Sequence, residues 1–505
     1  MPILDRPVIL WTALAYLVLV VVIGVWAVRR TRDARDFFIA GQSLGLWVTG
    51  FATMSAAFSG FVFLGGPGLT YRMGISSLFI AAPVGFTAGL LCWVVAKRLR
   101  LLAEVREVFT VPDALLARYD SRWASGLAAL AVVLGTVAYL GAQLQALGVL
   151  IEAIFGTREM FGEWSLAIAM AIGLVVVLFY AIAGGMVAGV YTDLFQGILM
   201  ALAAVGVFYY AIKSGGGLGE IGRSLVESER FGPAFLDPLG GISLFTALGF
   251  FFTFAVGNLG QPHMLHKFYM LRDPRQLKWL PAVIGGGQTM CVLIWLGIGL
   301  AVPALVVSGR LAPLARPDQA SPQFLLGFAP PFLAGLVFAG ILAAIMSTAD
   351  SFVNIGSAAL VRDLPKALGW KLPRQLFWGR VAVLAVAIAA AFFSYVYGDL
   401  IALLGTFAFG TFGAALAPAI AIGFNWRRVT PTAAIASIAV GTAVSVIGEF
   451  LARQKFFPDL PSLPLPNGVL PSSFALAASF LTLFVVTLAT RPVEPAEDVV
   501  AVMES

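Results

Sequence analysis

Charged residues are scarce in this chain. Asp, Glu, Lys and Arg make up 11% of its 505 residues, whereas 60% are hydrophobic. A soluble globular domain carries roughly 25% charged residues, and no polar block here is long enough to form one. The composition excludes an ordinary soluble protein and predicts an all-α polytopic membrane protein that forms a single domain over residues 1–505.

Cysteine and histidine are rare as well, with two of each. Cys92 and Cys291 both lie in apolar stretches, so a disulfide framework is not expected. His263 and His266 are three residues apart, which could suggest zinc or a proton relay, but Asp273 is the one acidic residue near them. We expect a structural elbow instead, with His263 hydrogen-bonded to the backbone of a broken helix.

Basic residues form short clusters rather than a continuous basic surface. The net charge of +6 therefore does not indicate nucleic-acid binding. No Ser/His/Asp arrangement and no His/Cys metal site is visible, so an enzyme is not predicted.

Long apolar runs occupy most of the chain. A transmembrane helix needs about 20 consecutive apolar residues, and about thirteen segments meet this requirement. They are 8–28, 46–72, 77–97, 124–154, 164–185, 188–212, 242–268, 281–306, 330–361, 379–397, 400–424, 431–452 and 472–490. Arginines follow the first run rather than precede it, and no small-residue cleavage site is present, so it reads as a retained helix and not a signal peptide.

The positions of Lys and Arg predict an orientation. If the N-terminus lies outside, the inner loops hold most of the 32 basic residues, in agreement with the positive-inside rule. These basic residues lie at Arg29, Arg30, Arg32 and Arg35, in 97–122, 267–278, 362–380 and 427–428, and at Arg491. The short tail 491–505 is then cytoplasmic.

Two of the predicted spans are interrupted. The second contains Gly60 and a Gly-Gly-Pro-Gly run at 65–68, and the seventh contains Gly-Asn-Leu-Gly-Gln-Pro at 257–262. Irregular backbone at membrane depth survives only where it is buried in protein or lines a cavity, although Gly and Pro are also simply common in membrane helices.

The spacing of the two breaks indicates an inverted-repeat transporter. Spans 2–6 would form a first repeat over 46–212, and spans 7–11 a second repeat over 242–424. An extra N-terminal helix at 8–28 and two C-terminal helices over 431–490 would flank this core.

The ninth predicted span carries oxygen-bearing side chains in an apolar run. Ser347, Asp350 and Ser351 share one face of a helix, with Thr348 beside them. An intramembrane carboxylate costs at least ~2.5–3.5 kcal/mol unless it is compensated, and hydroxyls and carboxylates suit a small hard cation. The hydroxyls could instead bond to carbonyls one turn earlier.

Five short sequence segments follow one another along the chain. They are 36–45, 55–60 with 65–68, 110–113 with 118–119, 260–263 with 267–268, and 344–351. In order and spacing they resemble motifs of the sodium/solute symporter family, which includes proline, pantothenate, monocarboxylate, sugar and choline carriers. The resemblance implies the leucine-transporter-like fold.

The resemblance also implies a sodium site between the first broken helix and the ninth span. Its ligands would be the backbone oxygens of Ser55 and Phe58, the carbonyl of Ala344, and the hydroxyls of Ser347 and Thr348. A dehydrated sodium ion is satisfied by a handful of such oxygens, which unwound backbone can supply.

Some family members have a second sodium position, which here would fall on Asp193, Asp350 and Ser351 together with Ser347. Asp350 departs from the pattern, because those members have a serine there. Two alternatives stay open: Asp193 could be a helix N-cap with Gln196 three residues on, and Asp350 could be fixed by a Lys or Arg.

The residues at the two breaks are candidates for solute binding and gating. They are Ser59, Gly60, Phe254, Asn258, Gly260, Gln261 and Pro262. Proline carriers have an aspartate where this chain has Ala57, and a Trp and a Tyr where it has Phe254 and Asn258. A carboxylate or zwitterion is expected, but proline is not favoured.

We therefore predict a sodium-coupled symporter of the cell inner membrane that imports a small organic solute, such as an amino acid or monocarboxylate. No cofactor besides Na⁺ is expected, and the expected partners are the solute, Na⁺ and the lipid bilayer. A sensor acting through a separate signalling partner is the alternative, because about fifteen residues follow the last span. A channel is not predicted, because it would need a continuous polar path and the polar residues here cluster near mid-membrane.

Overall fold

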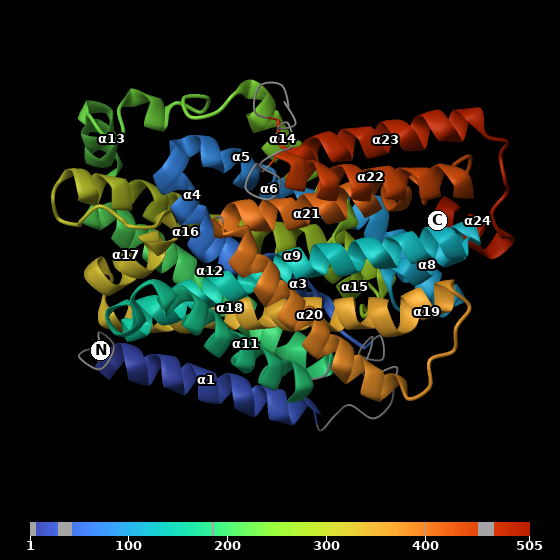
Figure 1. Ribbon diagram of the computed structural model, residues 1–505, viewed down its shortest axis with the longest axis horizontal. Helices are drawn as coiled ribbons and strands as arrows, with labels where there is room; N and C mark the ends of the chain where they lie inside the picture. Colours follow the sequence, from blue (N-terminus) through green and yellow to red (C-terminus); the bar gives the residue numbers. More distant parts are fainter. Residues whose placement is uncertain (1–6, 29–42, 184–185, 399, 453–468) are drawn as a thin grey trace.

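The computed structural model describes residues 7–28, 43–183, 186–398, 400–452 and 469–505, and these residues form an all-helical bundle (Figure 1). Within these ranges, nine helical stretches are long and apolar enough to cross a membrane. The number of crossings, about thirteen, stays a prediction. Arg29, Arg30, Arg32 and Arg35, and most of the 36–45 motif, lie outside the described residues.

Each predicted span coincides with one helix or with several short ones. The long helices are α1 (Pro7–Val28), α9 (Arg122–Phe155), α11 (Ser165–Ala183), α12 (Met186–Ser214), α16 (Leu280–Val307), α18 (Pro331–Ala358), α20 (Gln375–Tyr397), α21 (Ile401–Ala417), α22 (Pro431–Ala452) and α23 (Pro471–Ala489). Shorter helices that bear on the site or on the two ends of the bundle are α6 (Val84–Leu91), α7 (Lys97–Val105), α8 (Val111–Tyr119), α13 (Leu218–Glu227), α17 (Ala320–Phe328) and α19 (Leu364–Ala367).

The first predicted break is confirmed. Helix α3 (Leu46–Ala57) ends at Phe58, whose backbone is extended at φ −103° and ψ 114°. The chain then continues through a π-helical turn (Phe61–Gly65) into α4 (Gly66–Met73). The amide of Phe58 donates to the carbonyls of Met54 and Ser55, which closes α3.

The second predicted break is confirmed too. Helix α14 (Leu244–Ala255) gives way to a 3₁₀ turn (Gly257–Gly260), and Gln261 is extended at φ −80° and ψ 104°. Pro262 then starts α15 (Pro262–Phe268). Proline suits this position, because the first residue of a helix has no intrahelical partner for its N–H.

Helix α9 crosses the centre of the bundle and contacts α18, α20 and α21 (Figure 1). Of the most apolar part of Ile401–Ile422, which is α21 and the π-helical turn after it, 94% is buried inside the molecule, against 33% for α23. Helices α9, α18 and α21 therefore form the core, while α22 and α23 lie at its edge. Both broken helices meet this core, since α3 and α15 contact α18.

The C-terminal tail contains a docked helix, α24 (Glu497–Glu504). Asp498 accepts hydrogen bonds from Arg106 Nε at 2.6 Å and Nη2 at 2.8 Å, and Arg427 pairs with Glu504. The guanidinium of Arg106 holds the pKa of Asp498 below its usual value. In Figure 1, α24 lies at the same end of the bundle as α8 and α19, whereas α13 and α17 lie at the other.

Candidate functional site

The residues predicted to bind sodium lie where the first break meets the middle of α18. A Cβ added at Gly60 would lie 3.0 Å from Ile345 Cγ1 and 2.4 Å from Ala146 Cβ. The break therefore presses against α18 at Ile345, next to Ala344 and one turn before Thr348, and it has no room for a side chain at Gly60.

The hydroxyl of Thr348 is fully buried and has no hydrogen-bond partner in the part of the chain that the structure describes. It does not bond to the carbonyl one turn earlier, so that alternative for Thr348 is wrong. The Ser55 hydroxyl is likewise fully buried and has no hydrogen-bond partner among the described residues. Buried hydroxyls normally find a partner, so these two oxygens are available to a ligand.

Ser347 donates its hydroxyl proton to Asp193 Oδ1. A hydroxyl carries one donor and two acceptor lone pairs, so the same oxygen can still face a cation. Asp193 lies in the interior of α12, and its proposed role as an N-cap is therefore wrong.

Lys267, which the sequence analysis did not place in the site, reaches the same carboxylate. Its Nζ lies 2.9 Å from Asp193 Oδ2, and both side chains are at most 3% exposed. Asp193 and Lys267 are also the charged neighbours of Asp350. Asp350 Oδ1 has no hydrogen-bond partner among the described residues, and Ser351 is buried one residue later.

Helix α9 provides hydrogen-bond partners for Ser59 and Gly60 in the first break. Gln143 Oε1 accepts from the amide of Gly60 at 3.1 Å, and its Nε2 donates to Ser59 Oγ at 3.3 Å. The hydroxyl of Tyr139 lies 3.4 Å from Ser59 Oγ. Sequence reasoning missed Tyr139 and Gln143, although polar side chains within an otherwise apolar span were a usable signal.

The second break is held against α21. Gln261 Nε2 donates to the carbonyls of Gly257 and Phe409, both at 2.9 Å. A Cβ at Gly260 would lie 2.7 Å from the amide nitrogen of Ala417 and 2.8 Å from the carbonyl oxygen of Phe412, so only glycine fits there.

His263 differs from expectation. Neither ring nitrogen has a hydrogen-bond partner among the residues described, so it does not bond to the broken backbone as predicted. The imidazole instead packs against Phe352, with ring centroids 4.4 Å apart, and Phe352 in turn stacks on Tyr139 at 4.5 Å.

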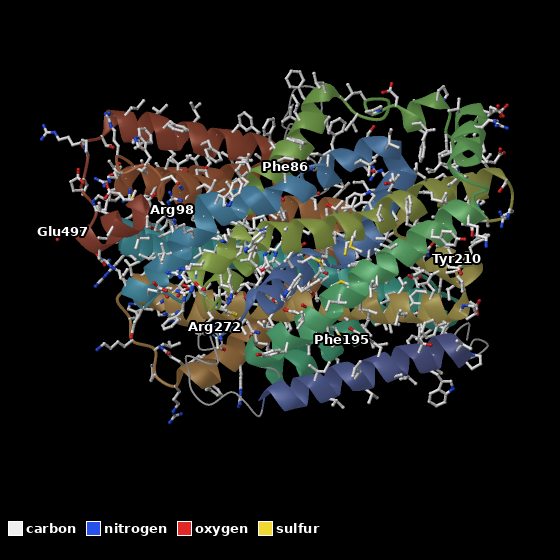
Figure 2. All side chains as sticks on the ribbon, turned by 180° about the vertical axis from the view of Figure 1, so that it is seen from behind. Phe86, Arg98, Phe195, Tyr210, Arg272 and Glu497 are labelled. Atoms are coloured by element: carbon white, nitrogen blue, oxygen red, sulfur yellow. The ribbon has the colours of Figure 1, made fainter. Side chains whose placement is uncertain are left out.

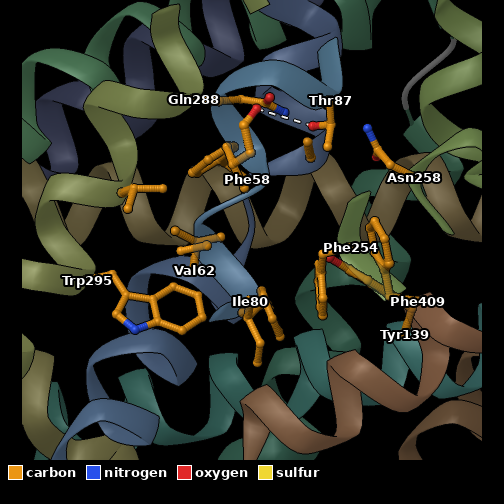
Figure 3. Close-up of a pocket in the computed structure, with 15 residues that line it drawn as sticks. Phe58, Val62, Ile80, Thr87, Tyr139, Phe254, Asn258, Gln288, Trp295 and Phe409 are labelled. Atoms are coloured by element: carbon orange, nitrogen blue, oxygen red, sulfur yellow. Dashed lines mark hydrogen bonds between the residues drawn. The ribbon is translucent and has the colours of Figure 1, made fainter. Parts of the chain in front are cut away.

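A cavity adjoins both breaks (Figure 3). Its lining consists of Ala57, Phe58, Phe61, Val62, Ile80, Ala81, Val84, Thr87, Tyr139, Phe254, Asn258, Gln288, Val292, Trp295 and Phe409. Of the residues predicted for solute binding, Phe254 and Asn258 are among these. Ser59, Gly60, Gly260, Gln261 and Pro262 are not part of the lining and belong to the two breaks themselves.

Aromatic rings dominate the cavity wall. Phe254 stacks on Phe409 at 4.5 Å and on Phe61 at 5.6 Å, and Phe61 meets the edge of Trp295 at 5.8 Å. In Figure 3, Phe254, Phe409 and Tyr139 gather on one side, with Trp295 across from them.

The polar groups of the wall are neutral. They are Asn258 from the second break, Gln288 from α16, Thr87 from α6 and Tyr139 from α9. No charged residue is part of the lining among the described residues. The cavity therefore offers hydrogen bonds and aromatic faces to a small solute, but no counter-charge.

The sequence of the chain also matches a known protein family. The profile of the sodium:solute symporter family matches residues 37–441. The chain belongs to this family. It is therefore a multi-pass membrane transporter and not an enzyme, and sodium is its coupling ion.

Two proline transporters show the extent of the relationship. The high-affinity proline transporter PutP of Bacillus subtilis is 28% identical over 478 residues, covering 93% of this chain and 95% of the relative. The sodium/proline symporter of Escherichia coli is 28% identical over 464 residues, covering 89% of each chain.

Two solved structures share the fold. A Na⁺-coupled sialic acid symporter in its substrate-bound outward-open state superposes with a TM-score of 0.76 at 16% identity, covering 97% of this chain and 99% of that one. The nucleobase-cation-symport transporter Mhp1 gives 0.56 at 14% identity, covering 94% and 99%. The predicted leucine-transporter-like fold is confirmed.

Proposed function

We propose that this symporter imports a small organic solute together with sodium bound between the first break and α18. The sodium ligands would be the backbone oxygens of Ser55 and Phe58, the carbonyl of Ala344, and the hydroxyls of Ser347 and Thr348. The Thr348 hydroxyl carries this proposal, because it is buried next to the break and has no partner within the described ranges. A buried polar group costs free energy unless something satisfies it.

Phe58 connects the ion to the solute. It is a proposed sodium ligand through its backbone and a wall of the cavity through its side chain. Sodium binding would fix the extended backbone at Phe58 and thereby complete the cavity. Coupling requires such a differential effect of one ligand on the site of the other.

The solute we propose is a small zwitterion or carboxylate, such as an amino acid or monocarboxylate. The curated relatives named above carry proline, and the neutral amides of Asn258 and Gln288 can bind carboxylate oxygens without a counter-charge. Ala57 lines the cavity, where the proline carriers would have an aspartate.

The gating and topology of the chain are proposals too. Gly260, Gln261 and Pro262 would set the angle between α14 and α15, and 46–212 and 242–424 would be the two repeats. Arg98, Arg272 and Glu497 lie toward the end of the bundle that carries α24 (Figure 2). The two arginines at this end support an N-terminus outside and a C-terminal tail in the cytoplasm. The inner membrane of the cell is the location that we propose.

A thermal-unfolding screen of the purified protein tests the function. Amino acids, monocarboxylates and sugars would each be added in sodium chloride and in potassium chloride of equal strength. We expect one class of solute to raise the melting temperature in sodium but far less in potassium, since a ligand stabilises the state that it binds. Equal stabilisation in the two salts would refute sodium coupling.

A further inference from the structure

Lys267 is a buried lysine in the last turn of α15, the helix that follows the second break. Its side chain is 3% exposed and its Nζ lies 2.9 Å from Asp193 Oδ2. Lysines at membrane depth are rare and nearly always paired, because an isolated ammonium there is expensive. This pair joins α15, which follows the second break, to α12.

Both oxygens of Asp193 accept a hydrogen bond in this arrangement. Oδ1 accepts from Ser347 and Oδ2 accepts from Lys267. The second sodium position inferred from the sequence needs the same carboxylate, with Asp350 and Ser351 beside it. An ammonium and a sodium ion compete for these oxygens and repel each other at short range, so the site has room for one cation.

We propose that the ammonium of Lys267 is a tethered cation that fills the position beside Asp193, so that the chain carries one sodium ion per transport cycle. This inference rests on the proposed function. It assigns the Lys267 ammonium, in place of sodium, to the second cation position at Asp193. Lys267 is fixed to the chain, so its charge is not delivered with the solute. Asp193 then orients Ser347 toward the first sodium ion without ligating sodium itself.

The test is the number of sodium ions bound per chain, measured with radioactive ²²Na⁺ at equilibrium on the purified full-length protein. The wild type should bind one. Lys267→Gln leaves the Asp193 carboxylate without its cation and should bind a second sodium ion, while Lys267→Arg should bind one. Two sodium ions in the wild type, or one in Lys267→Gln, would overturn the inference.

Lys267→Met is the second variant if Lys267→Gln does not fold, because its apolar side chain fills the same space without a charge. It should also bind a second sodium ion. A single sodium ion in this variant would overturn the inference. A wild type that binds no sodium would instead refute the proposed sodium site itself, and with it this inference.

Lys366→Gln serves as a control for the loss of a lysine elsewhere in the chain, at an aspartate that keeps Arg362 as a second partner at 2.7 Å. Lys366 also pairs with a buried aspartate, with Nζ 2.8 Å from Asp113 Oδ1, but its own side chain is 47% exposed. Its removal should leave the sodium count at that of the wild type. A second sodium ion in Lys366→Gln would mean that any broken ion pair creates one, and the inference would fall.

Discussion

Replacement of Thr348 by valine separates a sodium ligand from a structural hydroxyl. In the described residues, the Thr348 hydroxyl has no partner and is fully buried, so valine breaks no hydrogen bond. Removal of an unsatisfied buried polar group should raise the free energy of unfolding in sodium-free buffer, by up to about 1–3 kcal/mol. A structural hydroxyl would have the opposite effect.

Sodium binding should weaken in the same variant. Loss of one oxygen to a bound cation, at about 1–3 kcal/mol, corresponds to roughly 5- to 150-fold in affinity. At a sodium concentration about 100 times the wild-type Kd, sodium stabilises the wild type by about 2.7 kcal/mol, and a protein that binds about 100-fold more weakly by about 0.4 kcal/mol.

The assay is thermal unfolding over a sodium titration, with Thr487→Val as the matched control. Thr487 also has a fully buried hydroxyl without a partner in the described part of the chain, but it lies in the peripheral helix α23. Thr487→Val should gain stability and keep the wild-type sodium affinity. Unchanged sodium affinity in Thr348→Val, or lower stability without sodium, would refute the assignment.

Three further substitutions, two of them with a control variant, test the gate, the carboxylate cluster and the docked tail. Gly260→Ala should lower the free energy of unfolding by about 1–3 kcal/mol through overpacking and should slow uptake, because its Cβ meets backbone atoms at 2.7 and 2.8 Å. Gly286→Ala in α16, where a Cβ meets nothing within 4 Å, should change neither stability nor uptake. A wild-type uptake rate in Gly260→Ala would contradict the gating role. Asp350→Asn should alter the pH dependence of uptake, because it removes one carboxylate from a cluster with Asp193 and Lys267; an unchanged pH profile would count against this. Asp498→Ala should release α24 and expose the tail to protease at neutral pH, whereas Glu497→Ala, at an exposed position, should not. The pKa of Asp498 is lowered, so the Arg106–Asp498 contact should persist at neutral pH and weaken only below ~pH 4; a tail that is released between neutral pH and that value would contradict the assignment.

The helices and their breaks could be predicted from the sequence because their causes are local. Apolar runs of membrane length predict helices wherever they occur. Glycine and proline interrupt a helix through their own backbone chemistry, which is why the breaks near Gly60 and Gly260 were found. Thr348 stood out for a similar reason, as a hydroxyl within a long apolar run.

The pairing of Asp193 with Lys267 could not be predicted, because it joins α12 to α15 across 74 residues of chain. The same holds for the cavity, whose walls at Trp295 and Phe409 come from helices far from either break in sequence. The docked helix α24 could have been predicted from the sequence. Val499, Val502 and Met503 follow a helical spacing, and all three are buried.

The most direct test of the central claim is solute accumulation in proteoliposomes driven by sodium. With the solute found in the thermal screen, an inward sodium gradient should drive its transient accumulation above the external concentration, and an equal potassium gradient should not. Accumulation that is the same in both gradients, or sodium entry that does not depend on the solute, would contradict sodium-coupled symport by this chain.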